Sequence, residues 1–373
     1  MSVGGKNPIM ELIKRPMARA ARWRAEGTEG PRGVSGTEHS PEQFRGFSAF
    51  LKGEDDPDAA QPEIGRGGAA ARFTVSMVPN IARSMRGIVR AAYGLRNNPP
   101  RPRRKIEPHE LDELEGLALL HGADLIGYTQ IDPDHVFAGC RVLDRNVIVL
   151  GMEMNQADMA KAPHFDAEHE VHRVYADLGD VTLQVAQYLR RRGFAAEAGP
   201  ALGGDAVYPP IAQAAGLGRV GRNGLLLTEA FGPRLRLAVV YCSVDDLPFH
   251  RDPGAHEWMR QFCDMCGACV RRCPPGAIHT QPVLRANGAP TYVDNESCFP
   301  FFRANHGCGV CIKVCPFSHV PVEKLRTAFE RRHESERHQA RLETIMRTPE
   351  RVRLRVVEDA GSPTATEGSR DAS

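Results

Sequence analysis

The stretch that decides the fold is Cys263-Asp-Met-Cys266-Gly-Ala-Cys269-Val-Arg-Arg-Cys273-Pro274, followed by Cys298 and by Cys308-Gly-Val-Cys311-Ile-Lys-Val-Cys315-Pro316. Its first run has the C-x2-C-x2-C-x3-C-P spacing that ligates [4Fe–4S] clusters, in which the fourth cysteine serves the neighbouring cluster. The eight thiolates make two sets of four. We therefore predict two [4Fe–4S] clusters with crossed ligation, one held by Cys263, Cys266, Cys269 and Cys315, the other by Cys273, Cys298, Cys308 and Cys311.

Zinc and disulfides are the alternative uses of these cysteines. Four-thiolate zinc sites also use C-x2-C pairs, but they do not need a third cysteine at x2 and a fourth before proline. Disulfides need an oxidising compartment. The remaining cysteines, Cys140 and Cys242, are each flanked by apolar residues and are predicted to be buried thiols.

Composition limits the location and the partners of the chain. Its 373 residues carry a net charge of +2, so the whole protein is not built to bind polyanions. We find neither an apolar run long enough for a signal peptide nor one long enough to span a membrane. With its many cysteines assigned to clusters, the chain is predicted to be cytoplasmic.

The first 105 residues are predicted to be a largely flexible region, because residues 1–72 have few large apolar side chains. Residues 73–95 form a basic amphipathic pattern, which predicts a helix. Such a helix can lie on a membrane surface, so peripheral membrane contact is open, or it can dock onto the protein's own core, which we favour. At the other end, residues 321–373 are predicted to be a charged surface helix and a disordered tail.

The globular part begins near residue 106. Periodicity predicts helices over 108–121 and 166–192 and strands over 125–129, 146–154, 225–227 and 235–242. Gly216-Leu-Gly218-Arg-Val-Gly221 matches the dinucleotide fingerprint, but no strand precedes it. We expect its glycines to let the backbone approach a flat ligand. We reject a corrinoid motif at His135 on spacing, and we interpret His164, His169 and His172 as surface residues.

Several segments resemble reductive dehalogenases and the epoxyqueuosine reductases of tRNA modification. They are Ala214–Arg222, Gly232–Leu237, Phe262–Cys266 and Cys308–Phe317. The resemblance covers 106–320. It implies an α+β fold, with a nitroreductase-like cofactor domain at 106–250 fused to a bacterial two-[4Fe–4S] ferredoxin-like domain at 251–320. It also implies a base-off cobalamin, electrons from a low-potential ferredoxin or flavodoxin, and a cofactor loop that includes Gly216, Gly218, Gly221 and Arg222.

The same resemblance implies a proton donor. Tyr175, ahead of Ala186-Gln-Tyr-Leu-Arg190-x-x-Gly193, matches the dehalogenase tyrosine, and Arg234 or Arg236 would lower its pKa. The alternative is that Tyr175 belongs to the core, because it lies on the apolar stripe of its helix. Epoxyqueuosine reductases use an aspartate upstream of the glycine loop. Asp205 falls near that place, although a turn residue is the commoner explanation.

The sequence thus favours a cobalamin-dependent reductase supplied by two clusters, acting on an unknown substrate. The rival is a ferredoxin-like electron-transfer protein without cobalamin that docks a redox partner. In that case the side chains of Arg219 and Arg222 would block the glycine loop. A third hypothesis places a flavin or a substrate tetrapyrrole in the pocket. A tRNA partner rests on the epoxyqueuosine reductase precedent alone, since the core has no concentrated basic and aromatic patch.

Overall fold

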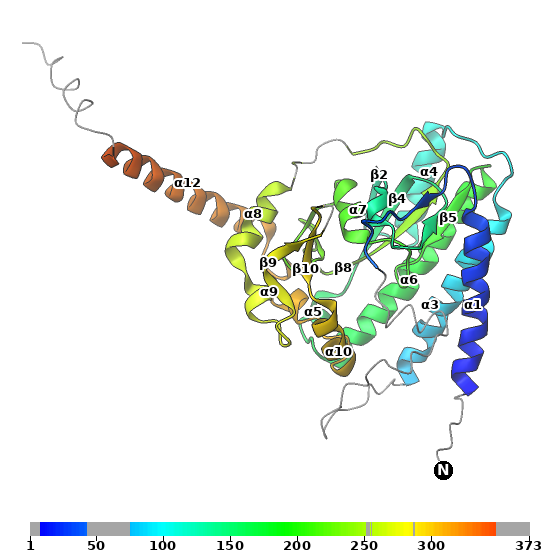
Figure 1. Ribbon diagram of the computed structural model, residues 1–373, viewed down its shortest axis with the longest axis horizontal. Coiled ribbons are helices and arrows are strands. Elements are labelled where there is room, and N and C mark those ends of the chain that lie inside the picture. The colour runs from blue at the N-terminus through cyan, green and yellow to red at the C-terminus, as the bar shows by residue number, and fades with distance from the viewer. Residues whose placement is uncertain (1–7, 43–74, 251–253, 255, 286–287, 348–373) are drawn as a thin grey trace, which may run out of the picture. The chain divides into compact units, whose positions relative to one another are not determined.

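The computed structural model describes residues 8–42, 75–250, 254, 256–285 and 288–347 (Figure 1). The chain divides into two units, Met1–Val322 and Glu323–Ser373. The first unit contains the central sheet, the glycine-rich loop and all eight cysteines of the two sets. The predicted flexible segments 1–7 and 43–74 and the predicted tail 348–373 lie outside the described residues.

The core is a four-stranded antiparallel sheet in the order β2 (Leu125–Gln130), β4 (Asn146–Glu153), β8 (Leu235–Cys242) and β5 (Ala196–Gly199). In β4 every residue but the last is buried, because both faces of the sheet are covered. The strands predicted at 125–129, 146–154 and 235–242 are thus present. The run at 225–227 becomes β7 (Leu226–Leu227), which pairs with β6 (Arg219–Val220).

Successive strand residues point to opposite faces and build two cores. On one face, Ile148 and Leu150 pack with α3 (Val78–Gly94), α4 (Pro108–Leu120) and α6 (Phe165–Arg191). On the other, Val147 and Val149 pack with α7 (Tyr208–Ala214). Figure 1 shows the long α6 running beside the sheet. The predicted α+β class is confirmed, and α6 matches the helix predicted at 166–192. The short elements are η1 (Val75–Met77), η2 (Leu95–Asn97), η3 (Pro133–His135) and α5 (Gln156–Met159).

The N-terminal region requires a correction, because residues 8–42 are packed against the sheet unit. Helix α1 (Pro8–Thr28) lies beside α3 (Figure 1), and the rings of Trp23 and Tyr93 meet edge to face at 5.4 Å. Strand β1 (Val34–Ser35) pairs with β3 (Arg141–Val142). The amphipathic α3 docks onto the core through its apolar face, as favoured above, so that this face is not free to lie on a membrane.

The cysteine segment folds into short helices around a hairpin. They are α8 (Glu257–Cys266), α9 (Ala268–Arg271), α10 (Asn295–Ala304), α11 (Val310–Lys313) and η4 (Pro316–Ser318). The hairpin pairs β9 (Ile278–Leu284) with β10 (Pro290–Val293) and lies between Cys273 and Cys298. Gly267, at φ +55°, ends α8 and begins α9, so that Cys266 and Cys269 project from two differently directed turns.

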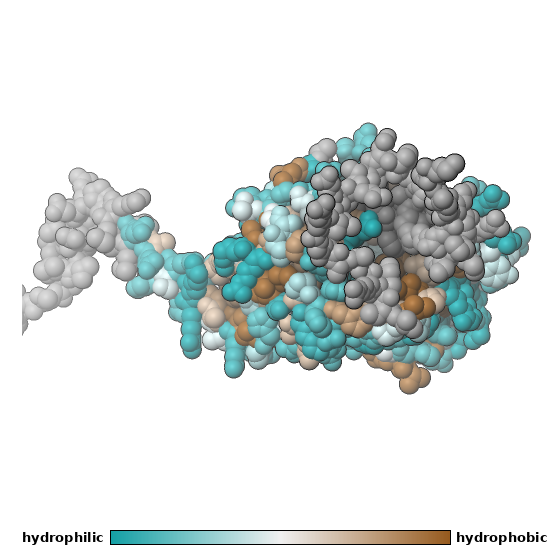
Figure 2. All heavy atoms as spheres, turned by 90° about the horizontal axis from the view of Figure 1, so that it is seen from below, coloured by the Kyte–Doolittle hydropathy of each residue, from teal (hydrophilic) through white to brown (hydrophobic). Residues whose placement is uncertain are grey.

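The second unit is described by α12 (Val322–Arg347), a highly charged helix. Along it, Arg332 and Glu336 form an ion pair at 3.0 Å with i,i+4 spacing. The space-filling view in Figure 2 shows mostly hydrophilic residues along α12, next to the grey terminus. In the part of the chain that the structure describes, no helix combines the length and the apolar character that a membrane crossing requires.

Candidate functional site

The eight cysteines gather in two groups, and none of the chain's ten cysteines forms a disulfide. In the first group, burial raises the pKa of Cys315 well above its usual value, and the neighbouring charges of Cys263, Cys269 and Cys266 raise it further. In the second, burial raises the pKa of Cys298, and the neighbouring thiols of Cys273 and Cys308 add to the effect. Buried thiols that repel one another as thiolates are the donor set that a cationic cluster stabilises.

Cys311 joins the second group. Burial raises its pKa to about 12, with further contributions from Cys308, Cys269, Cys298 and Cys273. Cys311 thus interacts with the other three cysteines of its predicted set and also with Cys269 of the first. The assignment of ligands to each cluster stays a prediction from the spacing. Among the described residues, no trio of His, Cys, Asp or Glu is placed to hold a single metal ion. The four cysteines of a cluster instead bind four different iron atoms, so their sulfurs stand farther apart.

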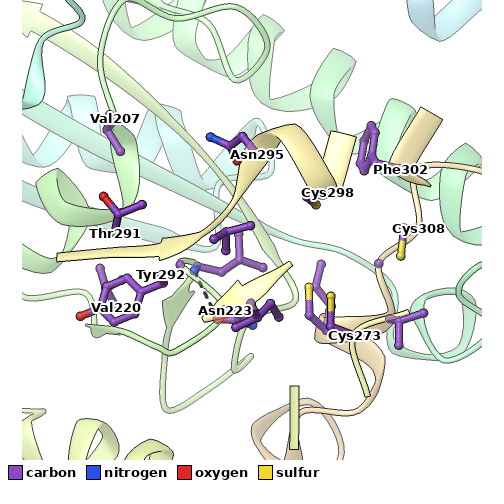
Figure 3. A pocket seen from close by; sticks show the side chains of 18 of the residues that line it. Val207, Val220, Asn223, Cys273, Thr291, Tyr292, Asn295, Cys298, Phe302 and Cys308 are labelled. Atoms are coloured by element: carbon purple, nitrogen blue, oxygen red, sulfur yellow. Dashed lines mark hydrogen bonds between the residues drawn. The ribbon is translucent and has the colours of Figure 1, made fainter. Parts of the chain in front are cut away.

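A large cavity opens beside the second group. Its volume is about 1020 Å³, and its walls come from the glycine-rich loop, α6, the β9–β10 hairpin and α10. All four cysteines of the second group line it, and none of the first group does. Figure 3 shows Cys273, Cys298 and Cys308 on one side and Val220, Thr291 and Tyr292 on the other. The cavity volume therefore lies at the upper end of the usual range of ligand pockets, which is about 1,000 Å³.

The glycines of the predicted cofactor loop pack closely against neighbouring parts of the protein. A Cβ on Gly216 would be 2.3 Å from the ring of His250, and one on Gly218 would be 2.0 Å from the carbonyl oxygen of Leu227. Gly221 similarly abuts the Leu227 side chain. These glycines allow the loop to pack against its own protein, and none of the three lines the cavity. The loop residues that do line it are Arg219, Val220, Asn223, Gly224 and Leu225.

Arg222, the fourth predicted cofactor residue, links the loop to the cysteine segment. Its guanidinium pairs with Asp264 at 3.2 Å and donates to the carbonyl of Thr280, and its backbone N–H donates to Cys263. Arg219 pairs with Glu257 at 2.7 Å. Both arginines therefore have carboxylate partners, and the blocked loop that would have favoured the rival hypothesis is not observed.

Tyr175 contacts Arg236, which lines the cavity, but Tyr175 itself is not part of the cavity wall. Ala167 and Val171 of α6 line the cavity, and Tyr175 follows one turn later on the same face of that helix. The guanidinium carbon of Arg236 lies 4.8 Å from the centre of the Tyr175 ring, and Arg236 itself lines the cavity. Tyr175 is half-buried and borders a separate small void. It is therefore not a fully enclosed core residue.

His172 was interpreted as a surface residue, and the structure corrects this. Its ring meets the ring of Tyr175 edge to face at 6.2 Å. Its Nδ1 is buried without a hydrogen-bond partner, as is the Nε of Arg236. Burial lowers the pKa of His172, and the charge of Arg236 lowers it further. The imidazole is therefore kept largely neutral beside the tyrosine.

Arg234 and Asp205 are not brought to the cavity. Arg234 is 6% exposed, donates from Nε to the carbonyl of Ser318 at 2.8 Å and pairs with Glu153, so it fastens β8 to the end of the cysteine segment. Asp205 pairs with Arg24 of α1 at 2.5 Å. Of the two candidate arginines, Arg236 is the one that faces Tyr175.

Sequence reasoning missed part of the cavity wall. His135, set aside with the rejected corrinoid motif, lines the cavity, and burial lowers its pKa. The hairpin contributes Arg285, Thr291 and Tyr292. The long insertion between Cys273 and Cys298 is the one sequence signal that could have directed attention to it.

The cysteine segment matches a known domain family. Residues 262–319 fit the 4Fe-4S dicluster domain, and this range includes all eight cysteines of the two groups. The chain therefore contains an iron–sulfur, metal-binding domain of the two-cluster type.

The chain is also similar to reductive dehalogenases. It is 30% identical over 213 residues to a tetrachloroethene reductive dehalogenase of Desulfitobacterium hafniense. The matched stretch covers 53% of this chain and 37% of that protein. It is 28% identical over 136 residues to an epoxyqueuosine reductase of Francisella cf. novicida (strain Fx1), which covers 33% of this chain and 35% of that protein. The resemblance predicted from the motifs is confirmed. The chain spans little more than a third of the length of either relative.

Solved structures agree on the fold. A catabolic reductive dehalogenase gives a TM-score of 0.55 at 20% identity, covering 66% of this chain and 38% of that one. A second, whose structure suggests a mechanism for B12-dependent dehalogenation, gives 0.54 at 22% identity, covering 66% of this chain and 39% of that one. The predicted fusion of an α+β cofactor domain to a ferredoxin-like two-cluster domain is therefore the fold of this chain.

Proposed function

We propose that this chain is an iron–sulfur reductase whose chemistry takes place in the cavity beside the second cysteine group. In this proposal Cys263, Cys266, Cys269 and Cys315 hold one [4Fe–4S] cluster, and Cys273, Cys298, Cys308 and Cys311 hold the other. The single observation that carries the proposal is that only the second group lines the cavity. A cluster held there would border the bound molecule directly, and the first cluster would pass electrons to the second.

The cavity beside the second group is large, and its walls suit the flat, mostly apolar ring of a corrin. The volume is about 1020 Å³, part of which the second cluster would occupy, and the walls expose more carbon than polar surface. Val207 and Val220, which lie away from the cysteines in Figure 3, and the lining residues Asn223 and Gly224 would contact the corrin. When bound, a corrinoid supplies low-potential metal chemistry that amino-acid side chains lack. We favour cobalamin over flavin because the similar reductive dehalogenase structure suggests a B12-dependent mechanism for that protein.

Tyr175 is the proposed proton donor, and Arg236 positions it. A cation over the face of a phenol ring stabilises the phenolate that remains after proton transfer. Arg236 reaches both the ring and the cavity, so it can compensate charge that develops on either side. Asp205 is not carried into this proposal, because Arg24 already holds it in an ion pair.

The proposed reaction is reductive cleavage of a bond between carbon and a heteroatom in a small molecule. The proposed electron source is a low-potential ferredoxin or flavodoxin that docks near the first cysteine group. Thiolate-held clusters and such a donor both fit a reducing cytoplasm, which is the location we propose.

The test is spectroscopic. The chain is reconstituted anaerobically with iron and sulfide and then titrated with cobalamin. We expect about eight iron atoms per chain from two four-iron clusters, and one corrin bound with its lower base released. Clusters without any corrin binding would contradict the catalytic half of the proposal and leave an electron-transfer protein.

A further inference from the structure

The cavity wall is one-sided in charge. Four arginines and three histidines line it, and among the residues that the structure describes no aspartate or glutamate does: the basic residues are Arg219, Arg236, Arg260, Arg285, His135, His250 and His306. Buried or half-buried cations are normally paired, because an unpaired charge away from water is costly. Whether each of these cations already has an anionic partner therefore decides what the cavity can accept.

Three of the basic residues that line the cavity already have a carboxylate partner. Arg219 pairs with Glu257 at 2.7 Å, Arg260 with Asp264 at 3.4 Å, and His306 with Glu168 at 2.9 Å. Arg236 lies over the Tyr175 ring, where the proposed mechanism uses it.

Arg285 shares with Arg236 the lack of a carboxylate partner among the described residues, but the proposed mechanism does not use it. It is half-buried, and within the described ranges it forms no ion pair with any carboxylate. Its Nε donates to the hydroxyl of Thr291 at 2.9 Å across the hairpin, which fixes the side chain on the cavity side. Burial lowers the pKa of His135, which also lines the cavity, and the charge of Arg285 lowers it further. A fixed guanidinium and a hydroxyl therefore lie together on the hairpin side of the cavity.

We propose that the cavity binds a small organic anion and that Arg285 holds its carboxylate or phenolate oxygen. This inference rests on the proposed function, because it names the substrate class of the same site. The guanidinium fork matches a carboxylate in two parallel hydrogen bonds, and the pairing is stronger away from water because the surroundings screen it less. Tyr292, Phe301 and Phe302 line the cavity and offer flat apolar surface for a ring attached to that anion.

A second anion that Arg285 could bind is the phosphate in the nucleotide tail of the corrinoid. The chemistry is shared, since both are oxyanions that a guanidinium binds. The two sources separate in a binding experiment, because a phosphate role changes the affinity for the corrin and a substrate role changes the affinity for the organic anion.

The experiment uses the cluster-loaded, corrin-loaded full chain and calorimetric titration with 3-bromobenzoate and with its neutral isostere 3-bromobenzamide. We expect 3-bromobenzoate to bind more tightly. The R285Q variant should lose at least about tenfold in affinity for the benzoate, as loss of a charged hydrogen bond predicts, and keep its affinity for the benzamide. R271Q is the matched control, because Arg271 is exposed on α9 of the same segment and does not line the cavity.

Several results would overturn the inference. They are equal affinity for the two probes, no binding of 3-bromobenzoate, and an R285Q variant with unchanged benzoate affinity. Loss of corrin from R285Q with unchanged benzoate affinity would assign Arg285 to the phosphate instead. The cluster and corrin spectra of the same samples report separately on the proposed function, so its failure is distinguished from failure of the anion site.

Discussion

The two cysteine groups have the same chemistry and opposite surroundings. The first lies away from the cavity and is partly enclosed: Cys263 and Cys315 are less than 10% exposed, while Cys266 and Cys269 are half-buried. Cys263 accepts a hydrogen bond from the backbone of Arg222, and the rings of Trp258, Phe262 and Phe317 pack nearby. The second forms a wall of the cavity. The same four-cysteine ligand set can therefore serve two roles. The first cluster would relay electrons within the protein, and the second would deliver them to the molecule in the cavity.

The largest effect is expected from breaking one cluster at a time. C311S should abolish substrate reduction with any reductant, because the cluster at the cavity is lost. C266S should abolish it with a protein donor but keep part of it with titanium(III) citrate, which is small enough to reach the second cluster. Turnover with each donor is the measurement, and EPR counts the clusters that remain. Equal loss in both variants with titanium(III) citrate would remove the distinction between the groups.

Tyr175 tests whether the chemistry lies on the cavity side. Y175F should lower turnover by about a hundredfold or more, the usual contribution of a positioned general acid, while cluster spectra stay unchanged. Y188F is the matched control on the same helix, since the Tyr188 hydroxyl donates to the carbonyl of Glu110, away from the cavity. Turnover of Y175F equal to that of Y188F would return Tyr175 to a packing role.

Two arginines of β8 distinguish a role in stability from a role in catalysis. R234Q should lower the free energy of unfolding by about 2–3 kcal/mol, because Arg234 makes buried charged hydrogen bonds to Ser318 and Glu153. R236Q should lower turnover and leave stability nearly unchanged, since Arg236 has no carboxylate partner among the described residues. Denaturant titration and turnover of both variants give the answer. A large loss of stability in R236Q would contradict the assignment.

The smallest effect is expected in the glycine-rich loop. G218A should cost about 1–2 kcal/mol of stability, because its Cβ would meet the backbone of Leu227 and force the loop to shift. G221A should cost less, since its Cβ would meet side-chain atoms of Leu227 and Asn223, at 2.8 Å or more, and no backbone atom so closely. Thermal unfolding of the two variants compares them. The opposite order would mean that ligand approach, and not packing, selects these glycines.

The sheet, α6 and the cysteine groups could be predicted from the sequence because their signals are local or regular. The strand at 146–154 is a continuous apolar run, α6 repeats its apolar positions with helical period, and the cysteine spacing encodes ligand geometry.

The remaining features depend on contacts between distant segments. Residues 8–42 are poor in apolar side chains, yet Arg24 reaches Glu197 at 2.8 Å and Arg32 reaches Asp144 at 2.8 Å. Those carboxylates are far along the chain, so composition alone predicted flexibility. The packing role of the loop glycines could not be predicted either, because a glycine that admits a ligand and one that admits a neighbouring backbone have the same sequence signature.

The central claim is that the second cysteine group delivers electrons into a corrin-binding cavity. The most direct test is EPR of the chain loaded with clusters and cobalamin and reduced stepwise. We predict two cluster signals and a corrin signal that broadens when the second cluster is reduced, with the broadening lost in C311S. A corrin signal indifferent to the state of both clusters, or no bound corrin, would contradict the account.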